Sequence, residues 1–434
     1  MHCSLHYANY VHYYHIIMLR RRAIDRKTRK TVALKKIFDA FQNSTDAQRT
    51  YREIMFLQEL NSSRHTHIIR LLNVLKADND RDIYLVFEYM EINLHSVIRA
   101  GILQDIHKRY IIYQILRALK YMHSGLLLHR DLKPSNILLN ADCSLKLCDF
   151  GLARSLVECD GGTNTGNSTS NESVQVLTDY VATRWYRAPE ILLGSHQYST
   201  AVDVWSMGCI LAEVLSSQPL FPGDSTMNQL ERILEVTGEP TYQQMMSIKS
   251  KHTLTMCENL TIRPQKSYES MFPTAPSDAI DLLNKLLQFS PDQRISIDQA
   301  IKHPYVAQFH DSANEPVCMQ PIPISIDDNK RYSISEYRKN LYRRIVERKK
   351  EIRQKRSSMM NNVTRSTTTL SQQNQRSNIL VASNSRKTLQ SQNNKSFHNN
   401  TINAQMTNNT IKSQPVNRVL SNTTNTLNNK KVFK

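Results

Sequence analysis

The chain has 434 residues, of which 40% are apolar, so it is long enough for two or three domain-sized cores. This excludes a short peptide scaffold and a wholly disordered protein. Its formal net charge of +18 suggests nucleic acid or a membrane as a partner, but residues 335–434 account for +17 of it. We therefore expect a near-neutral folded part and a basic tail, with nucleic acid bound at most weakly through that tail.

The cysteines and the apolar runs indicate the compartment. Seven cysteines are scattered without a CxxC pair, which is typical of reduced thiols rather than of a zinc or redox site. No apolar run approaches the roughly 20 residues that span a bilayer, and the chain does not start like a signal peptide. We expect no membrane partner and a location in the cytoplasm, the nucleus or both.

Residues 23–91 predict a small sheet with one helix. Thr31–Phe38 and Ile83–Phe87 are short β-like runs, and Asp46–Leu60 repeats its apolar residues at helical spacing. Residues 92–323 then predict a larger, mostly helical part. Its clearest helical segments are Lys108–Ser124, Asp203–Leu215, Met227–Val236 and Asp278–Gln288. The pattern favours the α+β class.

Residues 324–356 predict a docking segment followed by a basic helix, from Ile334 to Arg356. The basic residues of this helix are either a solvated face or a patch for nuclear import or an acidic partner. Asp327 and Asp328 are either remnants of an acidic docking patch or two solvated carboxylates. Residues 357–434 contain no Asp or Glu and are rich in Ser, Thr, Asn and Gln, so we expect a disordered tail.

The strongest pattern is HRDLKPSN at residues 129–136. Transfer of a phosphoryl group needs an oriented hydroxyl, metal ions and positive charge on the oxygens, and one loop with a carboxylate, an ammonium and an amide provides for all three. Asp131 would accept the hydroxyl proton, Lys133 would steady the phosphoryl group and Asn136 would hold Mg²⁺. Asp149, in the DFG at residues 149–151, would be the second metal ligand.

These motifs resemble the signature set of eukaryotic protein kinases, which implies a two-lobed fold, with ATP and Mg²⁺ as cofactors. Residues 32–35 read VALK and resemble the strand whose lysine meets the α- and β-phosphates. By this resemblance Lys35 pairs with Glu53, Phe87 is the gatekeeper, and Glu88 to Met90 form the hinge that meets adenine.

Three further residues match structural positions of that family. Glu190, in APE, ends the activation segment, and Arg294 matches its usual partner. Asp203, in DVWSMG, resembles the buried aspartate that supports the catalytic loop.

Thr178-Asp179-Tyr180, followed by VATRWYR, resembles the phosphorylation switch of mitogen-activated protein kinases. Each added phosphate would carry about −1.5 to −2 charge and needs cations around it. The resemblance implies that phosphorylated Thr178 meets one group of arginines and phosphorylated Tyr180 another. The first group is Arg52, Arg130 and Arg154, and the second is Arg184 and Arg187.

The same stretch implies the substrate class. Arg187 would shape the pocket for proline after the phosphoacceptor, so the expected protein substrates carry Ser/Thr-Pro sites. Thr183 is counted among the catalytic residues.

The insert at residues 220–270 resembles extra helices of mitogen-activated and cyclin-dependent kinases. The helix before Glu53 lacks a PSTAIRE-like sequence, which speaks against the cyclin-dependent group. Together with the long basic tail, the sequence is most similar to the atypical mitogen-activated protein kinase 15 branch. That resemblance implies autophosphorylation and a link to cilia and basal bodies.

The start of the chain departs from the family. Residues 1–22 contain no glycine, and the first glycine is Gly101, so the glycine-rich loop expected over the ATP phosphates is missing. This fits either a wrongly joined first exon or a natural short isoform. Two hypotheses follow: a kinase in which ATP positioning is impaired, or a pseudokinase scaffold.

Overall fold

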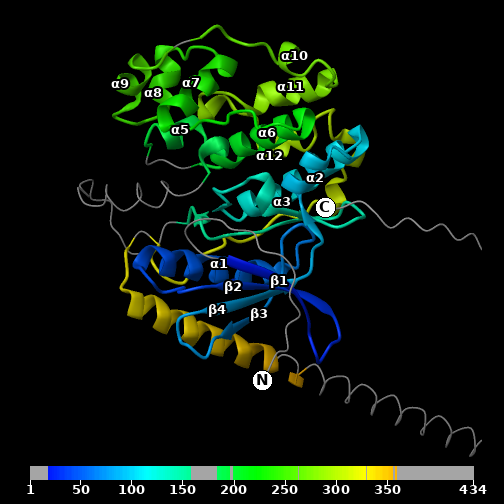
Figure 1. Cartoon of the computed structure of the whole chain (residues 1–434), viewed down its shortest axis with the longest axis vertical. Helices are drawn as coiled ribbons and strands as arrows, with labels where there is room; N and C mark the ends of the chain where they lie inside the picture. Colours follow the sequence, from blue (N-terminus) through cyan, green and yellow to red (C-terminus); the bar gives the residue numbers. More distant parts are fainter. Residues whose placement is uncertain are drawn as a thin grey trace, which may run out of the picture. The chain divides into compact units, whose positions relative to one another are not determined.

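The computed structural model describes residues 18–157, 183–195, 199–261, 263–328, 330–354 and 357–358. Residues Met1–Ile352 form one compact unit and Arg353–Lys434 a second. Within the first unit a small strand-rich lobe precedes a larger helical lobe (Figure 1), which confirms the two-lobed α+β class. The predicted tail at 357–434 lies almost wholly outside the described residues, so its disorder stays a prediction.

The small lobe is built on one antiparallel sheet. Its strands lie in the order β1 (Met18–Ile24), β2 (Thr31–Ile37), β4 (Ile83–Glu88) and β3 (Leu71–Lys76). β1 crosses the expected boundary between residues 22 and 23, because Met18 to Ile24 pair in register with Ile37 to Thr31. β3 was not predicted, because a bulge between Leu71 and Asn73 breaks the alternation of buried and exposed side chains.

Helix α1 (Ser44–Ser63) packs against this sheet and contains the predicted segment Asp46–Leu60. The helix begins where the Asn43 side chain accepts the N–H of Asp46, and it ends at Arg64, whose φ of 51° is left-handed. Ile54 and Leu57 are fully buried, and so are two charged residues of the same helix, Arg52 and Glu53. Buried charges need partners, and those partners define the site described below.

The large lobe is organised around two long helices, α3 (Asp105–Ser124) and α6 (Ala201–Ser216), which contact each other. Both were predicted from apolar spacing. The helices α7 (Thr226–Thr237) and α11 (Ser277–Leu286) also confirm predictions, although α11 ends before Gln288, because Leu287 leaves the helical region with ψ of 60°. The short helices are α2 (Leu94–Ala100), α5 (Pro189–Leu192), α8 (Tyr242–Ser247), α9 (Thr253–Glu258), α10 (Tyr268–Met271) and α12 (Ile297–Ala300).

The remaining elements are short strands and 3₁₀ turns. The strands are β5 (Ile92–Asn93), β6 (Leu127–Leu128), β7 (Ile137–Leu139), β8 (Leu145–Leu147) and β9 (Arg154–Ser155). The turns are η1 (Pro134–Asn136), η2 (Arg184–Tyr186), η3 (Pro291–Gln293), η4 (Ala307–Phe309) and η5 (Ser312–Asn314). β6 pairs with β9, and β7 pairs with both β5 and β8.

The predicted basic helix is present at residues 334–354 and lies along the small lobe (yellow in Figure 1). Tyr337 and Leu341 are fully buried, and the Tyr337 ring centroid lies 5.9 Å from that of Tyr51 on α1. Lys349 donates to the Val74 carbonyl at 3.2 Å. One face of this helix is therefore part of the small-lobe core, and only the other can serve a solvent or partner role.

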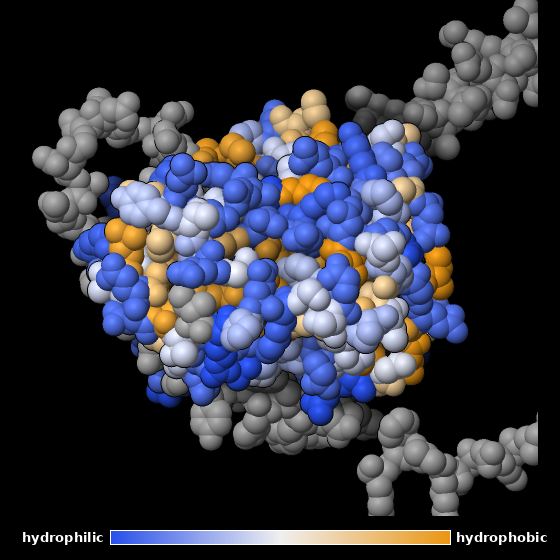
Figure 2. Space-filling view, turned by 90° about the horizontal axis from the view of Figure 1, so that it is seen from above, coloured by the Kyte–Doolittle hydropathy of each residue, from blue (hydrophilic) through white to orange (hydrophobic). Residues whose placement is uncertain are grey.

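Figure 2 views the molecule from the large-lobe side. Hydrophilic residues cover most of this face, and apolar residues form small separate groups on it. Within the described part of the chain, no helix has the length and apolarity needed to cross a membrane.

Candidate active site

Asp131 lies in the loop between β6 and β7, and two neighbours in that loop orient its carboxylate. Lys133 Nζ lies 2.7 Å from Asp131 Oδ2, and Asn136 Nδ2 donates to the same oxygen at 3.0 Å. The Asp131 side chain keeps 15% of its surface exposed. The Asp131 carboxylate is therefore fixed in orientation and still accessible to solvent, and a general base needs both properties to accept a proton.

Asp203 on α6 fixes the backbone of this loop by hydrogen bonds. Its carboxylate accepts the backbone N–H groups of His129 at 2.9 Å and Arg130 at 2.8 Å, and it contacts His123 Nε2 at 3.0 Å. Arg130 has φ of 64°, a left-handed conformation that costs energy in a non-glycine residue. Burial raises the pKa of Asp203, but the hydrogen bond with His123 and the neighbouring histidines outweigh it and keep the pKa below its ordinary value. The predicted supporting role of Asp203 is confirmed.

The DFG segment lies directly beside the catalytic loop. Cys148 donates its backbone N–H to the Asn136 carbonyl at 2.9 Å, and the Phe150 ring lies 5.0 Å from the His129 ring. Phe150 is fully buried, whereas Asp149 is only half-buried and has φ of 71°. These contacts bring Asp149 to the same loop as Asp131 and Asn136, and neither aspartate is sealed in the interior.

The oxygen atoms of this group fit Mg²⁺. Asn136 uses its amide nitrogen on Asp131, so its carbonyl oxygen is the atom left for a cation, and Asp149 offers a carboxylate. Mg²⁺ prefers oxygen ligands and commonly takes one or two from protein and the rest from water and substrate phosphates. Among the described residues, no three His, Cys, Asp or Glu gather into a metal site, so the ion would depend on such outside ligands.

Lys35 on β2 and Glu53 on α1 form the expected ion pair. Lys35 Nζ lies 2.6 Å and 2.8 Å from the two Glu53 oxygens, and both side chains are 6% exposed. The pair joins the sheet to the helix.

The predicted nucleotide-facing residues lie at the end of β4. Phe87 is buried and stands opposite Ala33 of β2 in the sheet register. The Glu88 side chain accepts the Arg70 N–H at 2.9 Å and lies 3.0 Å from Lys146 Nζ. Because the Glu88 carboxylate is already engaged, the hinge from Glu88 to Met90 would meet adenine through its backbone.

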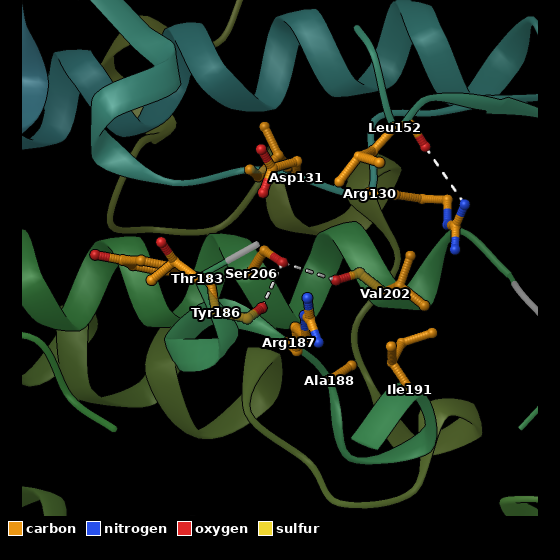
Figure 3. A pocket seen from close by; sticks show the side chains of 11 residues that line it. Arg130, Asp131, Leu152, Thr183, Tyr186, Arg187, Ala188, Ile191, Val202 and Ser206 are labelled. Atoms are coloured by element: carbon orange, nitrogen blue, oxygen red, sulfur yellow. Dashed lines mark hydrogen bonds between the residues drawn. The ribbon is translucent and has the colours of Figure 1, made fainter. Parts of the chain in front are cut away.

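A pocket opens beside Asp131 (Figure 3). It is lined by residues of the catalytic loop, the DFG turn, the segment that leads into α5, α5 itself and α6. They are Arg130, Asp131, Leu132, Leu152, Thr183, Tyr186, Arg187, Ala188, Ile191, Val202 and Ser206. Thr183 and Arg187 thus line the same pocket as Asp131, and their roles toward a substrate stay predictions.

Two hydroxyl groups that the sequence reasoning did not assign hold the wall of this pocket. Ser206 on α6 donates to the Tyr186 carbonyl at 2.8 Å, and the Tyr186 hydroxyl donates to the buried Glu213 at 2.6 Å. Ser206 and Tyr186 both lie in motifs that the sequence analysis recognised. Their partners are distant in the sequence, because Ser206 is 20 positions from Tyr186 and Tyr186 is 27 positions from Glu213, so no local pattern indicates these hydrogen bonds.

The switch residues Thr178 and Tyr180 lie outside the described residues, but their predicted arginines do not. Arg52 is 1% exposed, and its Nε donates to both oxygens of Asp328 at 2.7 and 2.9 Å. Arg154 Nη1 lies 2.5 Å from Asp328 Oδ2. Burial lowers the pKa of Arg52 to about 10; Asp328 opposes this, while Arg154 and Arg130 add to it by their charge. Arg52 and Arg154 therefore share the Asp328 carboxylate, and Arg130 lies near enough for its charge to act on Arg52.

Asp328 is neither of the things that the sequence suggested. It is not a solvated carboxylate, because its side chain is 11% exposed, and it does not face outward as a docking residue would. Of the second arginine group, Arg184 donates to the Asp224 carbonyl, and Arg187 lines the pocket beside Asp131.

The predicted structural pair of the activation segment is confirmed. Arg294 Nη1 and Nη2 each lie 2.7 Å from one oxygen of Glu190, and the guanidinium lies 5.1 Å from the Trp205 ring centroid. A bidentate pair of this kind fixes α5 to the segment that follows η3.

Comparison with known proteins agrees with this geometry. Residues 20–306 match the protein kinase domain family. The chain is 59% identical over 337 residues to extracellular signal-regulated kinase 2 of Dictyostelium discoideum, covering 78% of this chain and 89% of that protein. It is 52% identical over 348 residues to mitogen-activated protein kinase 15 of Xenopus laevis, and 50% identical over 337 residues to that of Rattus norvegicus.

These two vertebrate relatives are longer proteins. The matches cover 80% and 77% of this chain but only 58% and 60% of theirs. The kinase domain match, the relatives' identities and the confirmed ion pairs together lead to one assignment. The chain belongs to the mitogen-activated protein kinases, a family of Ser/Thr protein kinases, in the branch that resembles mitogen-activated protein kinase 15.

Proposed function

We propose that this kinase transfers the γ-phosphate of ATP to Ser or Thr residues that precede proline, and that phosphorylation of Thr178 and Tyr180 activates it. One observation carries the proposal. Lys133 and Asn136 both bond the Asp131 carboxylate, and Asp131 lines one pocket together with Thr183 and Arg187.

Each group in the cleft has one task. Asp131 accepts the proton of the substrate hydroxyl, and Lys133, 2.7 Å away, steadies charge on the transferring phosphoryl group. Lys35, oriented by Glu53, holds the α- and β-phosphates of the substrate ATP. When bound to Asp149 and Asn136, Mg²⁺ supplies charge neutralisation.

The preference for proline rests on the pocket walls. They contain Leu132, Leu152, Ala188, Ile191 and Val202, which offer apolar surface to a ring. Proline has no backbone N–H, so it loses no hydrogen bond on entering such a pocket, whereas another residue leaves an N–H unpaired.

The activation proposal rests on Arg52. Its Nη1 and Nη2 atoms are buried and have no hydrogen-bond partner among the described residues, although its Nε is paired. Unpaired buried donors beside other cations favour a dianion. The first phosphate arrives either from an upstream kinase or by autophosphorylation.

The experiment uses the full chain, labelled ATP, Mg²⁺ and two peptides that differ only in Ser-Pro against Ser-Ala. We expect label on the Ser-Pro peptide, on Thr178 and on Tyr180, with all three lost in Asp131→Asn. Asp298→Asn, which changes an exposed carboxylate of α12, is the matched control. Equal labelling of both peptides would contradict the proline preference.

A pseudokinase scaffold is the second candidate, favoured by the absence of any glycine before Gly101. A variant in which a glycine-rich strand and turn replace residues 1–17 separates the two. If neither chain transfers phosphate, the scaffold is the better account. If only the variant does, this chain is an impaired kinase. A location in the cytoplasm, in the nucleus or at a cilium stays a prediction.

A further inference from the structure

Asp328 links two elements that are far apart in the sequence. It follows the helical lobe in the chain, and its carboxylate reaches Arg52 on α1, at 2.7 and 2.9 Å, and Arg154 on β9, at 2.5 Å. Its backbone carbonyl accepts Arg154 Nη1 at 2.8 Å and Gln48 Nε2 at 3.2 Å. One residue thus ties the helix that carries Glu53 to the strand that follows the DFG turn.

The cluster needs this carboxylate. Arg52 is buried, and a buried cation without a counter-ion is strongly disfavoured. Arg154 and Arg130 bring further positive charge to the same place. Within the described part of the chain, Asp328 is the only carboxylate that bonds Arg52. Without it, three guanidinium groups would repel one another around a buried site.

The position of Arg52 connects this cluster to the reaction. Arg52 precedes Glu53, and Glu53 holds Lys35 at 2.6 Å. If Arg52 were released from Asp328, charge repulsion would push α1 away from Arg154. Glu53 would then move with the helix, and Lys35 would lose its orientation.

We propose that Asp328 is a positioning residue of the kinase reaction: it neutralises the cluster of Arg52, Arg130 and Arg154 before Thr178 is phosphorylated, and so keeps Glu53 against Lys35. This inference rests on the proposed function. It adds one carboxylate, Asp328, to that function. Before phosphorylation this carboxylate supplies part of the negative charge that the phosphate on Thr178 supplies afterwards. The unpaired Nη atoms of Arg52 are available to the phosphate while Nε stays on Asp328.

The test measures kcat and KM for ATP on the full chain with a Ser-Pro peptide. Asp328→Asn removes the charge, Asp328→Glu keeps it, and Asp327→Asn is the control at the neighbouring carboxylate, whose side chain is 29% exposed. Each variant is prepared in two backgrounds. In the first, Thr178 is replaced by Ala; in the second, Thr178 is kept and is phosphorylated, as verified by mass spectrometry.

In the Thr178→Ala background we expect Asp328→Asn to lower kcat/KM for ATP by about 10- to 100-fold, because the lysine is misplaced. Asp328→Glu should recover part of the loss, and Asp327→Asn should change little. In the phosphorylated protein the loss should shrink, because the phosphate supplies the missing negative charge. This dependence on phosphorylation separates positioning from a purely structural role.

Three outcomes would overturn the inference. An increase of activity in Asp328→Asn would make the aspartate a competitor of the phosphate. An equal loss in both backgrounds would make it a structural contact alone. Where the Thr178→Ala chain transfers no phosphate, amide hydrogen exchange in α1 decides: faster exchange in Asp328→Asn than in Asp327→Asn supports the inference, and equal exchange rejects it. Absent activity in every chain counts against the proposed function instead.

Discussion

Lys35 Nζ lies 2.6 Å from Glu53 Oε1, and this buried ion pair joins the central strand pair of the small lobe to α1. Arg52, the residue before Glu53 in α1, donates to the Asp328 carboxylate at 2.7 Å. Two neighbouring residues therefore hold α1, one to the sheet and the other to the segment that carries Asp328.

Glu53→Gln should lower kcat/KM for ATP on the order of 100-fold, because the neutral amide no longer orients the Lys35 ammonium towards the phosphates. Steady-state kinetics at varied ATP checks this. Glu59→Gln, on the same helix but with its side chain 47% exposed, is the control and should behave like the unchanged protein. If both variants lose activity equally, the helix rather than the ion pair is responsible.

Tyr186→Phe should impair the substrate side of the site. The Tyr186 hydroxyl is lost from the buried Glu213, a carboxylate whose pKa is raised by burial, and the pocket wall shifts. We expect kcat/KM for the Ser-Pro peptide to fall by about 3- to 10-fold while KM for ATP stays constant. Tyr242→Phe, at an exposed tyrosine of α8, serves for comparison. A matching rise in KM for ATP would show that the change spreads beyond the pocket.

Arg294→Lys should lower the free energy of unfolding by about 2–3 kcal/mol. Lysine keeps the charge but cannot contact both Glu190 oxygens, so part of a buried pair is left unsatisfied. Urea unfolding measures the loss. Arg263→Lys changes an exposed arginine paired with Glu235 and should shift stability by less than about 1 kcal/mol. Similar shifts in both variants would mean that the bidentate geometry contributes nothing.

His65 and His67 should make stability depend on pH. Burial lowers the pKa of His65 to about 3 and that of His67 to about 4, from an ordinary value of 6.5. His67 Nδ1 lies 3.2 Å from the Leu145 carbonyl, and Arg117 Nη1 lies 3.0 Å from Nε2, which together hold the neutral tautomer with the proton on Nδ1.

Because the unfolded chain binds these protons first, the stability that the neutral histidines contribute is fully present above pH 6.5 and is lost as pH falls, towards about 4 for His67 and about 3 for His65. In this range the free energy of unfolding should fall by about 1.4 kcal/mol per pH unit for each histidine. Urea unfolding from pH 7 to pH 4 should show a shallower slope in His65→Phe than in the control His252→Phe, whose histidine is exposed. An unchanged slope would show that His65 is already protonated in the folded protein.

Local sequence patterns were enough to predict the long helices and to indicate phosphoryl transfer. Apolar spacing placed α1, α3, α6, α7 and α11, because a helix with one buried face shows its period in the sequence. It did not place β3, where a bulge removes the alternation. The motifs around Asp131 and Asp149 indicated phosphoryl transfer, since those residue types at that spacing serve few other reactions.

By itself, then, the sequence determined the fold class, the protein kinase family and the candidate residues for the reaction, because each of these depends on short segments whose chemistry is local. Only the tertiary structure decided which distant side chains meet. Asp328 lies 276 positions from Arg52, and Ser206 lies 20 positions from Tyr186. Such contacts follow from how helices and loops pack against one another, and packing depends on the whole chain, so no window of sequence around Asp328 could indicate the cluster that it neutralises.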